Sequence, residues 1–152
     1  MNYANKTILI VDDDADDFAL LQQALHNIED HHHIIRALDG VHALELLQQM
    51  KASGQFPSLI VLDINMPRLD GKQTLTIIQR DALLRSIPVV LFSTSSSAMD
   101  KTFSLLKHVE LIIKPSSVKT MHAVATKMLH YCNGHLMADV LSLECGLPVK
   151  EI

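Results

Sequence analysis

The sequence between positions 59 and 71 is Leu59-Ile60-Val61-Leu62-Asp63-Ile64-Asn65-Met66-Pro67-Arg68-Leu69-Asp70-Gly71. It starts with a short apolar run rich in branched side chains, which is typical of a buried strand in a parallel sheet. The run ends in a carboxylate, Asp63, and Asp70-Gly71 supplies turn chemistry before a helical pattern begins. Open α/β sheets place their ligand crevices at the carboxyl ends of strands, so Asp63 is a candidate for chemistry as well as for capping a turn.

Strand patterns and helical patterns alternate along the chain on both sides of this stretch. The predicted strands are residues 6–11, 33–37, 59–63, 88–92 and 109–113. The predicted helices are centred on residues 18–25, 41–47, 74–78, 99–107 and 117–133, and Asp14 or Asp16 is placed to cap the first of them. Such alternation with short loops predicts an α/β fold, a doubly wound five-stranded parallel sheet in a three-layer sandwich. Residues 1–133 form the predicted domain, and residues 134–152 form a tail that is either helical or frayed.

The composition excludes several function classes. The chain has 152 residues, of which 48% are hydrophobic and 20% charged, as in one ordinary domain with a sizeable core. A net charge of −4 offers no basic surface for nucleic acid. No apolar run approaches the roughly 20 residues of a membrane helix, residues 1–6 lack the apolar core of a signal peptide, and Cys132 and Cys145 have no metal-finger or disulfide spacing. A soluble cytoplasmic protein is expected.

Four of the predicted strands lead directly into chemically active side chains. These are the Asp12-Asp13 pair, Asp63, Ser93 and Lys114. In a parallel sheet all carboxyl ends lie on one edge, so these groups can converge. Two carboxylates about 4 Å apart repel by roughly 4 kcal/mol near a protein surface, and three together need a cation or raised pKa values. Oxygen ligands with open positions suit Mg²⁺, while a hydroxyl and an ammonium suit phosphoryl oxygens. The set predicts a phosphoryl site.

Five motifs in this order resemble the receiver domain of two-component response regulators. They are Val11-Asp12-Asp13, Leu62-Asp63 through Met66-Pro67, Asp70-Gly71, Pro88 to Ser93, and Lys114-Pro115, and the resemblance covers about residues 6–133. It implies a flavodoxin-like (βα)5 fold and a phosphorelay protein that takes a phosphoryl group from a sensor histidine kinase or a phosphotransfer protein. It also implies a chemotaxis-type, stand-alone regulator that signals by docking on a protein partner rather than by catalysing a reaction as an enzyme.

The resemblance carries roles over to individual residues. Asp63 is the implied phosphoacceptor. Asp13 is implied to bind Mg²⁺ (or Mn²⁺) directly and Asp12 mostly through water, with the Asn65 backbone carbonyl completing the protein's share of the metal shell. Ser93 takes the position of the family's switch hydroxyl and Lys114 pairs with the phosphoryl oxygen. The Lys114–Pro115 bond is expected to be cis.

Two departures from the family pattern concern the output of the signal. Leu111 stands where the family usually has Tyr or Phe, three residues before the lysine. Leucine offers no aromatic ring to swing inward, so the usual switch is not expected to operate in its usual form. The segment 100–114 is about one residue short and lacks the customary Gly-Ala, which predicts an altered corner between helix and strand.

Two alternatives remain beside the receiver prediction, and the role of the tail is a separate prediction. A haloacid-dehalogenase-type phosphatase would use Asp12 as nucleophile and Asp14 as acid/base, with Ser93 and Lys114 in matching roles, but it needs a further acidic pair beyond the lysine, and no acidic residue lies between Lys114 and Asp139. A pseudo-receiver would bind partners without phosphorylation, and Leu111 is compatible with it. The apolar tail residues could dock on the domain or on a second copy of the chain, giving a homodimer.

The run His31-His32-His33 is predicted to be an exposed turn and not a metal site. Three consecutive side chains do not share one face of a helix, and neighbouring side chains in a strand point to opposite sides.

Overall fold

Five strands form a single parallel sheet in the computed structural model, which describes residues 6–94 and 97–134. The strands are β1 (Thr7–Val11), β2 (His33–Ala37), β3 (Leu59–Asp63), β4 (Val89–Ser93) and β5 (Glu110–Ile113). Their order across the sheet is β2-β1-β3-β4-β5. The chain thus adds β2 on one side of β1 and then adds β3, β4 and β5 on the other side, so the strand order reverses between β1 and β3. This is the flavodoxin-like order, and it confirms the predicted fold.

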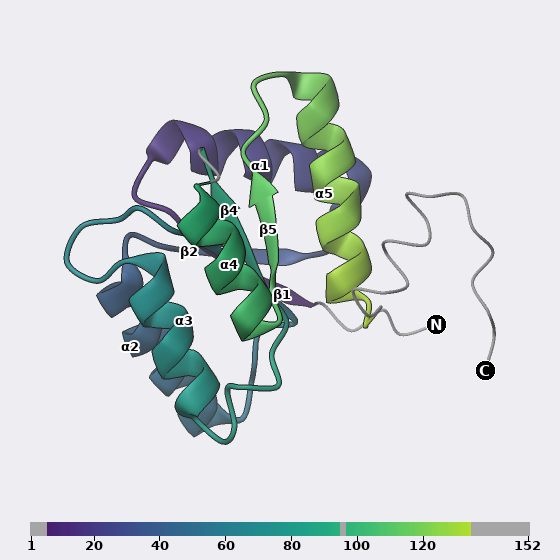
Figure 1. Ribbon diagram of the computed structural model, residues 1–152. Coiled ribbons are helices and arrows are strands. Elements are labelled where there is room, and N and C mark those ends of the chain that lie inside the picture. Colours follow the sequence, from purple (N-terminus) through teal and green to yellow (C-terminus); the bar gives the residue numbers. More distant parts are fainter. Residues whose placement is uncertain (1–5, 95–96, 135–152) are drawn as a thin grey trace, which may run out of the picture.

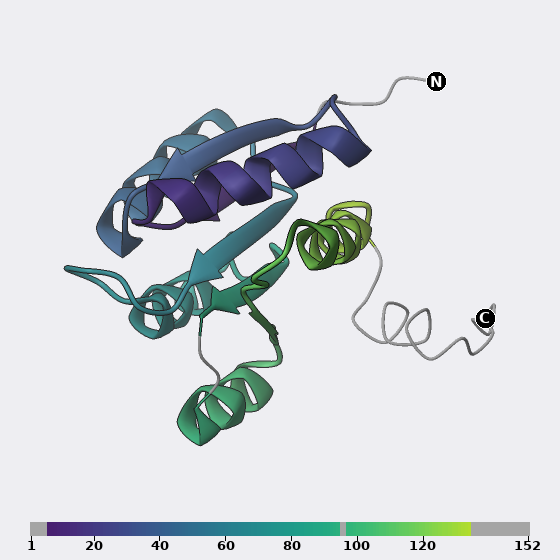
Figure 2. The same ribbon diagram turned by 90° about the horizontal axis from the view of Figure 1, so that it is seen from above.

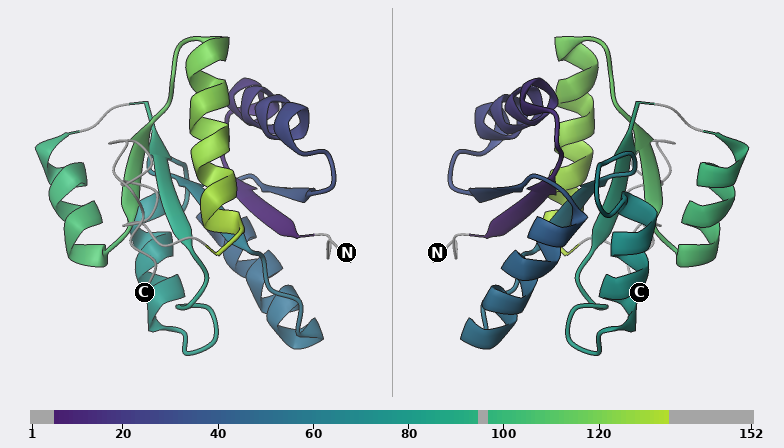
Figure 3. Two further views of the ribbon diagram at one scale, coloured as in Figure 1. Left: turned by 90° about the vertical axis from the view of Figure 1, so that its right-hand side faces the viewer. Right: turned by 90° about the vertical axis from the view of Figure 1, so that its left-hand side faces the viewer.

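Five helices cover the two faces of the sheet. They are α1 (Ala15–Ile28), α2 (Gly40–Ser53), α3 (Gly71–Arg80), α4 (Ala98–Lys107) and α5 (Val118–Cys132). One apolar cluster joins α1 and α5 to the sheet, and a second cluster joins α2 and α3 to its other face. Figure 3 shows these two helix pairs on opposite sides of the strands, and α4 lies beside β5 (Figures 1 and 2).

The central strand is buried on both faces. All five residues of β3 are buried, as are all five of β4, which explains their uninterrupted apolar sequences. The edge strand β2 is mostly half-buried. Asp63 therefore stands at the end of a strand that is buried along its whole length.

Short polar side chains begin all five helices. Asp14, Asp39, Asp70, Ser97 and Ser117 each accept a hydrogen bond from a backbone N–H in the first helical turn. A cap of this kind stabilises a helix by about 1 kcal/mol. Asp14 is thus the cap of α1, one of the two residues that the sequence offered for this role.

The corner between α4 and β5 is built without glycine. His108 ends α4 in the left-handed conformation, with φ at 57°, and its N–H donates to the carbonyl of Leu105. Val109 then donates to the Ser104 carbonyl at 3.1 Å, and β5 begins one residue later than predicted. The short segment is therefore accommodated by a histidine at a position that usually favours glycine.

The Lys114–Pro115 peptide bond is trans, so the expectation of a cis bond was wrong. The trans form is intrinsically favoured by about 0.5–1 kcal/mol before proline. Here it joins β5 to the cap of α5 while the Lys114 N–H still donates to the Ser93 carbonyl at 2.7 Å. The tail at residues 135–152, including Cys145, lies outside the described residues.

Among the helices described, none combines the length and the apolar character that crossing a membrane requires.

Candidate functional site

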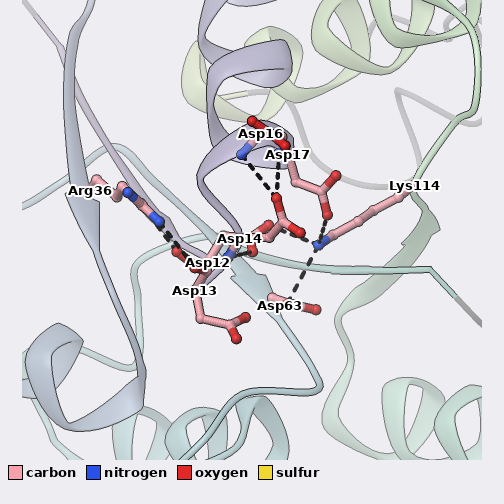
Figure 4. Close-up of polar contacts among 8 residues, drawn as sticks. All are labelled: Asp12, Asp13, Asp14, Asp16, Asp17, Arg36, Asp63 and Lys114. Atoms are coloured by element: carbon pink, nitrogen blue, oxygen red, sulfur yellow. Dashed lines mark hydrogen bonds and ion pairs between the residues drawn. The ribbon is translucent and has the colours of Figure 1, made fainter.

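The carboxyl edge of the sheet gathers the acidic and basic groups predicted to converge. Asp12 follows β1, Asp63 ends β3 and Lys114 follows β5. Asp12 and Asp63 flank the point between β1 and β3 where the strand order reverses, and they are only 2% and 6% exposed. Figure 4 shows the Lys114 ammonium group among three of the carboxylates.

Lys114 bridges carboxylates from three parts of the chain. Its Nζ lies 2.8 Å from Asp12 Oδ2, 2.9 Å from Asp17 Oδ2 and 3.5 Å from Asp63 Oδ2. Burial alone would lower the pKa of Lys114, but the hydrogen bonds to Asp12 and Asp17 and the charge of Asp63 outweigh it, and the pKa lies above its ordinary value. The lysine therefore stays charged at the edge of the pocket.

Asp17 belongs to this site, although the sequence analysis did not single it out. It lies four residues before Leu21, and Leu25 follows at the same spacing; both leucines are fully buried against the sheet. A period of four places Asp17 on the same stripe of α1, one turn nearer the pocket. That spacing is the signal that could have identified it.

The acidity of Asp63 is weakened by its surroundings. Burial raises the pKa of Asp63 to about 6, the charge of Lys114 opposes that rise, and the charge of Asp12 adds to it. A carboxylate in this environment is destabilised unless a second cation approaches it. The pocket has carboxylate in excess over ammonium.

A divalent cation fits the remaining donor set. One carboxylate oxygen from each of Asp12, Asp13 and Asp63 lies within 4.8 Å of the others. Asp12 Oδ1 accepts from the Asp14 N–H at 2.9 Å and its Oδ2 from Lys114, so both of its oxygens are already engaged. Asp13 is exposed, while Arg36 donates to its backbone carbonyl and to that of Asp12. Hard oxygen donors with open positions are what Mg²⁺ and Mn²⁺ prefer.

The loop after β3 folds back closely onto Asp63. The Gly71 N–H donates to the Ile64 carbonyl at 2.8 Å, and a Cβ at Gly71 would lie 2.1 Å from the Asp63 carbonyl oxygen. Farther along the loop, Arg68 adopts a positive φ of 66° and donates to Asp39 at 2.7 Å. Asn65 is exposed on this loop. The loop is thereby anchored at Gly71 and at the start of α2.

Ser93 and Leu111 lie on the neighbouring strands β4 and β5. Asp63 pairs with Phe92, so Ser93 stands one residue farther along the same edge, and it is fully buried. Leu111 pairs with Leu91 and packs, partly buried, against the apolar cluster on the α2–α3 side. The structure places Ser93 at the pocket edge, and it gives Leu111 a packing role.

The sequence and the structure both resemble known proteins. A family model described as the response regulator receiver domain matches residues 8–126. The response regulator Rcp1 of Synechocystis sp. is 35% identical over 116 residues, which cover 73% of this chain and 77% of Rcp1. The phosphorylated cyanobacterial phytochrome response regulator RcpA has a TM-score of 0.78 at 33% identity, covering 86% of this chain and 96% of RcpA. The Mn²⁺-bound form of Rcp1 has a TM-score of 0.74 at 30% identity, covering 87% and 97%.

Proposed function

Because the chain belongs to the family of response regulator receiver domains, we propose that it accepts a phosphoryl group on Asp63 from a phosphohistidine donor. The observation that carries the proposal is the position of Asp63: buried at the end of β3, beside two further acidic residues and 3.5 Å from the Lys114 ammonium. In this position the Lys114 ammonium can stabilise the negative charge of the incoming phosphoryl group, and burial shields the resulting acyl phosphate from water.

In the proposed reaction an Asp63 carboxylate oxygen attacks the phosphorus atom and the donor imidazole leaves. Lys114 moves from bridging carboxylates to pairing with a phosphoryl oxygen, and the Ser93 hydroxyl donates to another. Both residues act by holding charge and geometry, which is how phosphoryl transfer is mainly catalysed. The chain is thus an acceptor that takes part in its own modification, and it is not a classical enzyme.

A divalent ion, Mg²⁺ or Mn²⁺, completes the proposed site. Asp13 and Asp63 would bind it directly, Asp12 through water, and the Asn65 carbonyl would supply a further oxygen. Both carboxylate oxygens of Asp12 already accept hydrogen bonds, which supports binding of the ion by Asp12 through water. The Mn²⁺-bound form of Rcp1 supports a divalent ion of this class. When bound, the ion neutralises charge on the phosphoryl oxygens.

The phosphatase alternative is wrong, because the chain matches the receiver family. Its proposed acid/base, Asp14, instead caps α1 by accepting from the N–H groups of Asp16 and Asp17 at 2.9 and 3.0 Å. These hydrogen bonds, that from Asp17 first, hold the pKa of Asp14 below its usual range, which is unsuited to a general acid.

Incubation with a small phosphodonor such as acetyl phosphate tests the proposal. In the presence of Mg²⁺ we expect intact-mass spectrometry to show one added phosphoryl group per chain. With a chelator in place of Mg²⁺ the modification should be lost, because the carboxylate pocket then repels the donor. A chain that stays unmodified with every donor and metal tried would be a pseudo-receiver.

The Asp13→Ala variant should bind Mg²⁺ at least tenfold more weakly than the wild type. It removes the exposed carboxylate while Asp12 remains tied to Lys114, so the ion loses a direct ligand. Isothermal titration calorimetry measures the affinity, and Asp16→Ala, also exposed and in the same acidic run, is the control. Equal affinities for Asp13→Ala and the wild type would rule out the ligand set.

The proposed output is a shift of α4 relative to Ser93; residues 95–96, which lie between them, are outside the described residues. A phosphoryl group favours only the state in which both Ser93 and Lys114 contact it. Leu105 and Leu106 on α4 are each 73% exposed, which gives a protein partner an apolar surface that a shift of α4 would change. No swing of an aromatic ring at position 111 is involved.

Hydrogen exchange with and without beryllium fluoride, which mimics a phosphoryl group, tests this route. We expect altered amide protection across α4 and β5 as well as at Asp63, because α4 rests on β5. The Asp63→Asn variant, to which the mimic should not bind, is the control. Changes of amide protection confined to the pocket would exclude the route.

Four further expectations stay predictions: a sensor histidine kinase as donor, a protein output partner, a homodimer and a cytoplasmic location.

A further inference from the structure

The connection between α1 and β2 holds a cluster of metal-binding side chains far from Asp63. Residues 29–32 form this connection, and it leads into the amino-terminal end of β2. All strands are parallel, so the connection lies at the opposite edge of the sheet from the acidic pocket. The cluster consists of Glu29, His31 and His32. Its chemistry is separate from that of the phosphoryl site.

The three side chains converge on a small volume. Glu29 Oε2 lies 3.5 Å from His32 Nδ1 and 3.7 Å from His31 Nε2, and the two imidazole rings are 4.5 Å apart. In a tetrahedral zinc site with bonds of about 2.0–2.1 Å, two ligand atoms are roughly 3.3 Å apart. The spacing from the carboxylate to each ring therefore already approaches that of a metal site.

His32 carries a second and independent observation. Its side chain is 1% exposed, yet neither ring nitrogen has a hydrogen-bond partner among the described residues. Leaving a buried polar group unsatisfied costs about 1–3 kcal/mol, so such groups usually have a partner. The predicted turn is present, but the expectation of exposure was wrong for this histidine. A metal ion bound to His32 Nδ1 would satisfy the atom nearest to Glu29.

The cluster is also reachable from solvent. His32 lines a hollow of about 430 Å³ whose wall includes His26, His33 and Gln22. Glu29 and His31 side chains are 34% and 38% exposed. An ion could reach the cluster past the partly exposed Glu29 and His31 side chains and keep a water molecule as its fourth ligand.

We propose that Glu29, His31 and His32 form a binding site for a transition-metal ion of the zinc class. Two imidazole nitrogens and one carboxylate oxygen suit Zn²⁺ and its neighbours, whereas Mg²⁺ prefers oxygen ligands alone. The bound ion ties the end of α1 to the start of β2. Since metal bound only by the folded state stabilises it, the ion also raises the melting temperature.

Zinc titration of the full chain in excess Mg²⁺ tests the site, because Mg²⁺ occupies the acidic pocket. Calorimetry should show one Zn²⁺ per chain, and the ring resonances of His31 and His32 should shift in nuclear magnetic resonance spectra. Glu29→Gln and His31→Ala should each raise the dissociation constant at least tenfold, since losing even the groups behind metal ligands costs about 10- to 100-fold.

His122→Ala is the matched control, because it removes an exposed histidine on α5 that is not in the cluster. It should leave the Zn²⁺ affinity unchanged. Glu29→Gln and His31→Ala keep the buried His32 ring, and circular dichroism verifies that both variants are folded. Three results would each overturn the proposal. They are a wild-type chain that binds no Zn²⁺ in excess Mg²⁺, a Zn²⁺ affinity that is unchanged in both cluster variants, and a loss of Zn²⁺ affinity in His122→Ala as large as theirs. Failure of phosphorylation would leave it standing.

Discussion

The Asp63→Asn variant is expected to gain no phosphoryl group from acetyl phosphate and Mg²⁺ while the wild type gains one. The amide keeps the shape of the side chain, but its neutral carbonyl oxygen is a poor nucleophile compared with a carboxylate oxygen, and the lost negative charge weakens the metal site as well. Intact-mass spectrometry measures the difference. Asp30→Asn is a matched control, since Asp30 is exposed beyond the end of α1. If Asp63→Asn were modified at the wild-type rate, the acceptor would have to be another residue.

The same variant should be more stable than the wild type when no metal is present. The pKa of Asp63 is raised to about 6 in the folded state, so the folded chain binds this proton more tightly than the unfolded chain. The free energy of unfolding of the wild type therefore falls as pH rises from about 4 to about 6 and stays lower above that. We expect Asp63→Asn to remove a penalty of about 1–2 kcal/mol at pH 8 and much less at pH 4.

Urea denaturation at both pH values, with a chelator present, measures this difference. Adding Mg²⁺ at pH 8 should narrow it, because the ion stabilises the wild type and not the variant. A variant that is less stable than the wild type at pH 8 without metal would show that Asp63 is well satisfied by Lys114 alone.

Gly71→Ala is expected to destabilise the fold by about 2–4 kcal/mol and to slow phosphorylation. The added Cβ would lie 2.1 Å from the Asp63 carbonyl oxygen and 2.8 Å from Ile64 Cα. Both contacts are with backbone, which has no flexible end that can move aside. The backbone must therefore shift at Asp63, the proposed acceptor, and the distance from Asp63 to Lys114 changes with it.

Gly54→Ala separates this effect from the general cost of losing a glycine. Gly54 has a φ of 72° with no atom within 4 Å of an added Cβ, so alanine there meets only backbone strain of about 1 kcal/mol. Denaturation curves compare the stabilities, and the rate of phosphorylation is measured on folded protein. Gly71→Ala with wild-type stability and rate would show that the loop adjusts without moving Asp63.

The sequence predicted the sheet and the convergence of Asp12, Asp63 and Lys114 at its carboxyl edge because both depend on local patterns. Apolar runs ending in Asp63 and in Asp12 identify strands and their carboxyl ends without any knowledge of packing. Parallel pairing then brings those ends to one edge. The caps of the helices follow from single residues such as Asp70 and Ser97. These features require no information about distant parts of the chain.

The features that the sequence analysis missed depend on packing between distant elements. Asp17 reaches the pocket only because α1 lies against the sheet next to the end of β5. His32 is buried although its neighbours are exposed, since the turn after α1 directs one ring inward. The bond before Pro115 is trans, and the Lys-Pro sequence alone does not decide between the two isomers. Neither the hydropathy pattern nor the residue spacing specifies these features.

The contacts of Lys114 have a consequence for folding during synthesis on the ribosome. Its partners Asp12 and Asp17 lie 102 and 97 residues earlier in the sequence. During synthesis the Asp63 carboxylate and its acidic neighbours leave the ribosome long before the Lys114 ammonium does. Contacts so far apart in sequence form late, because a long loop must close first. A partly made chain thus carries the carboxylates without the charge that balances them, and the proposed phosphoryl site is assembled only when the domain is nearly complete.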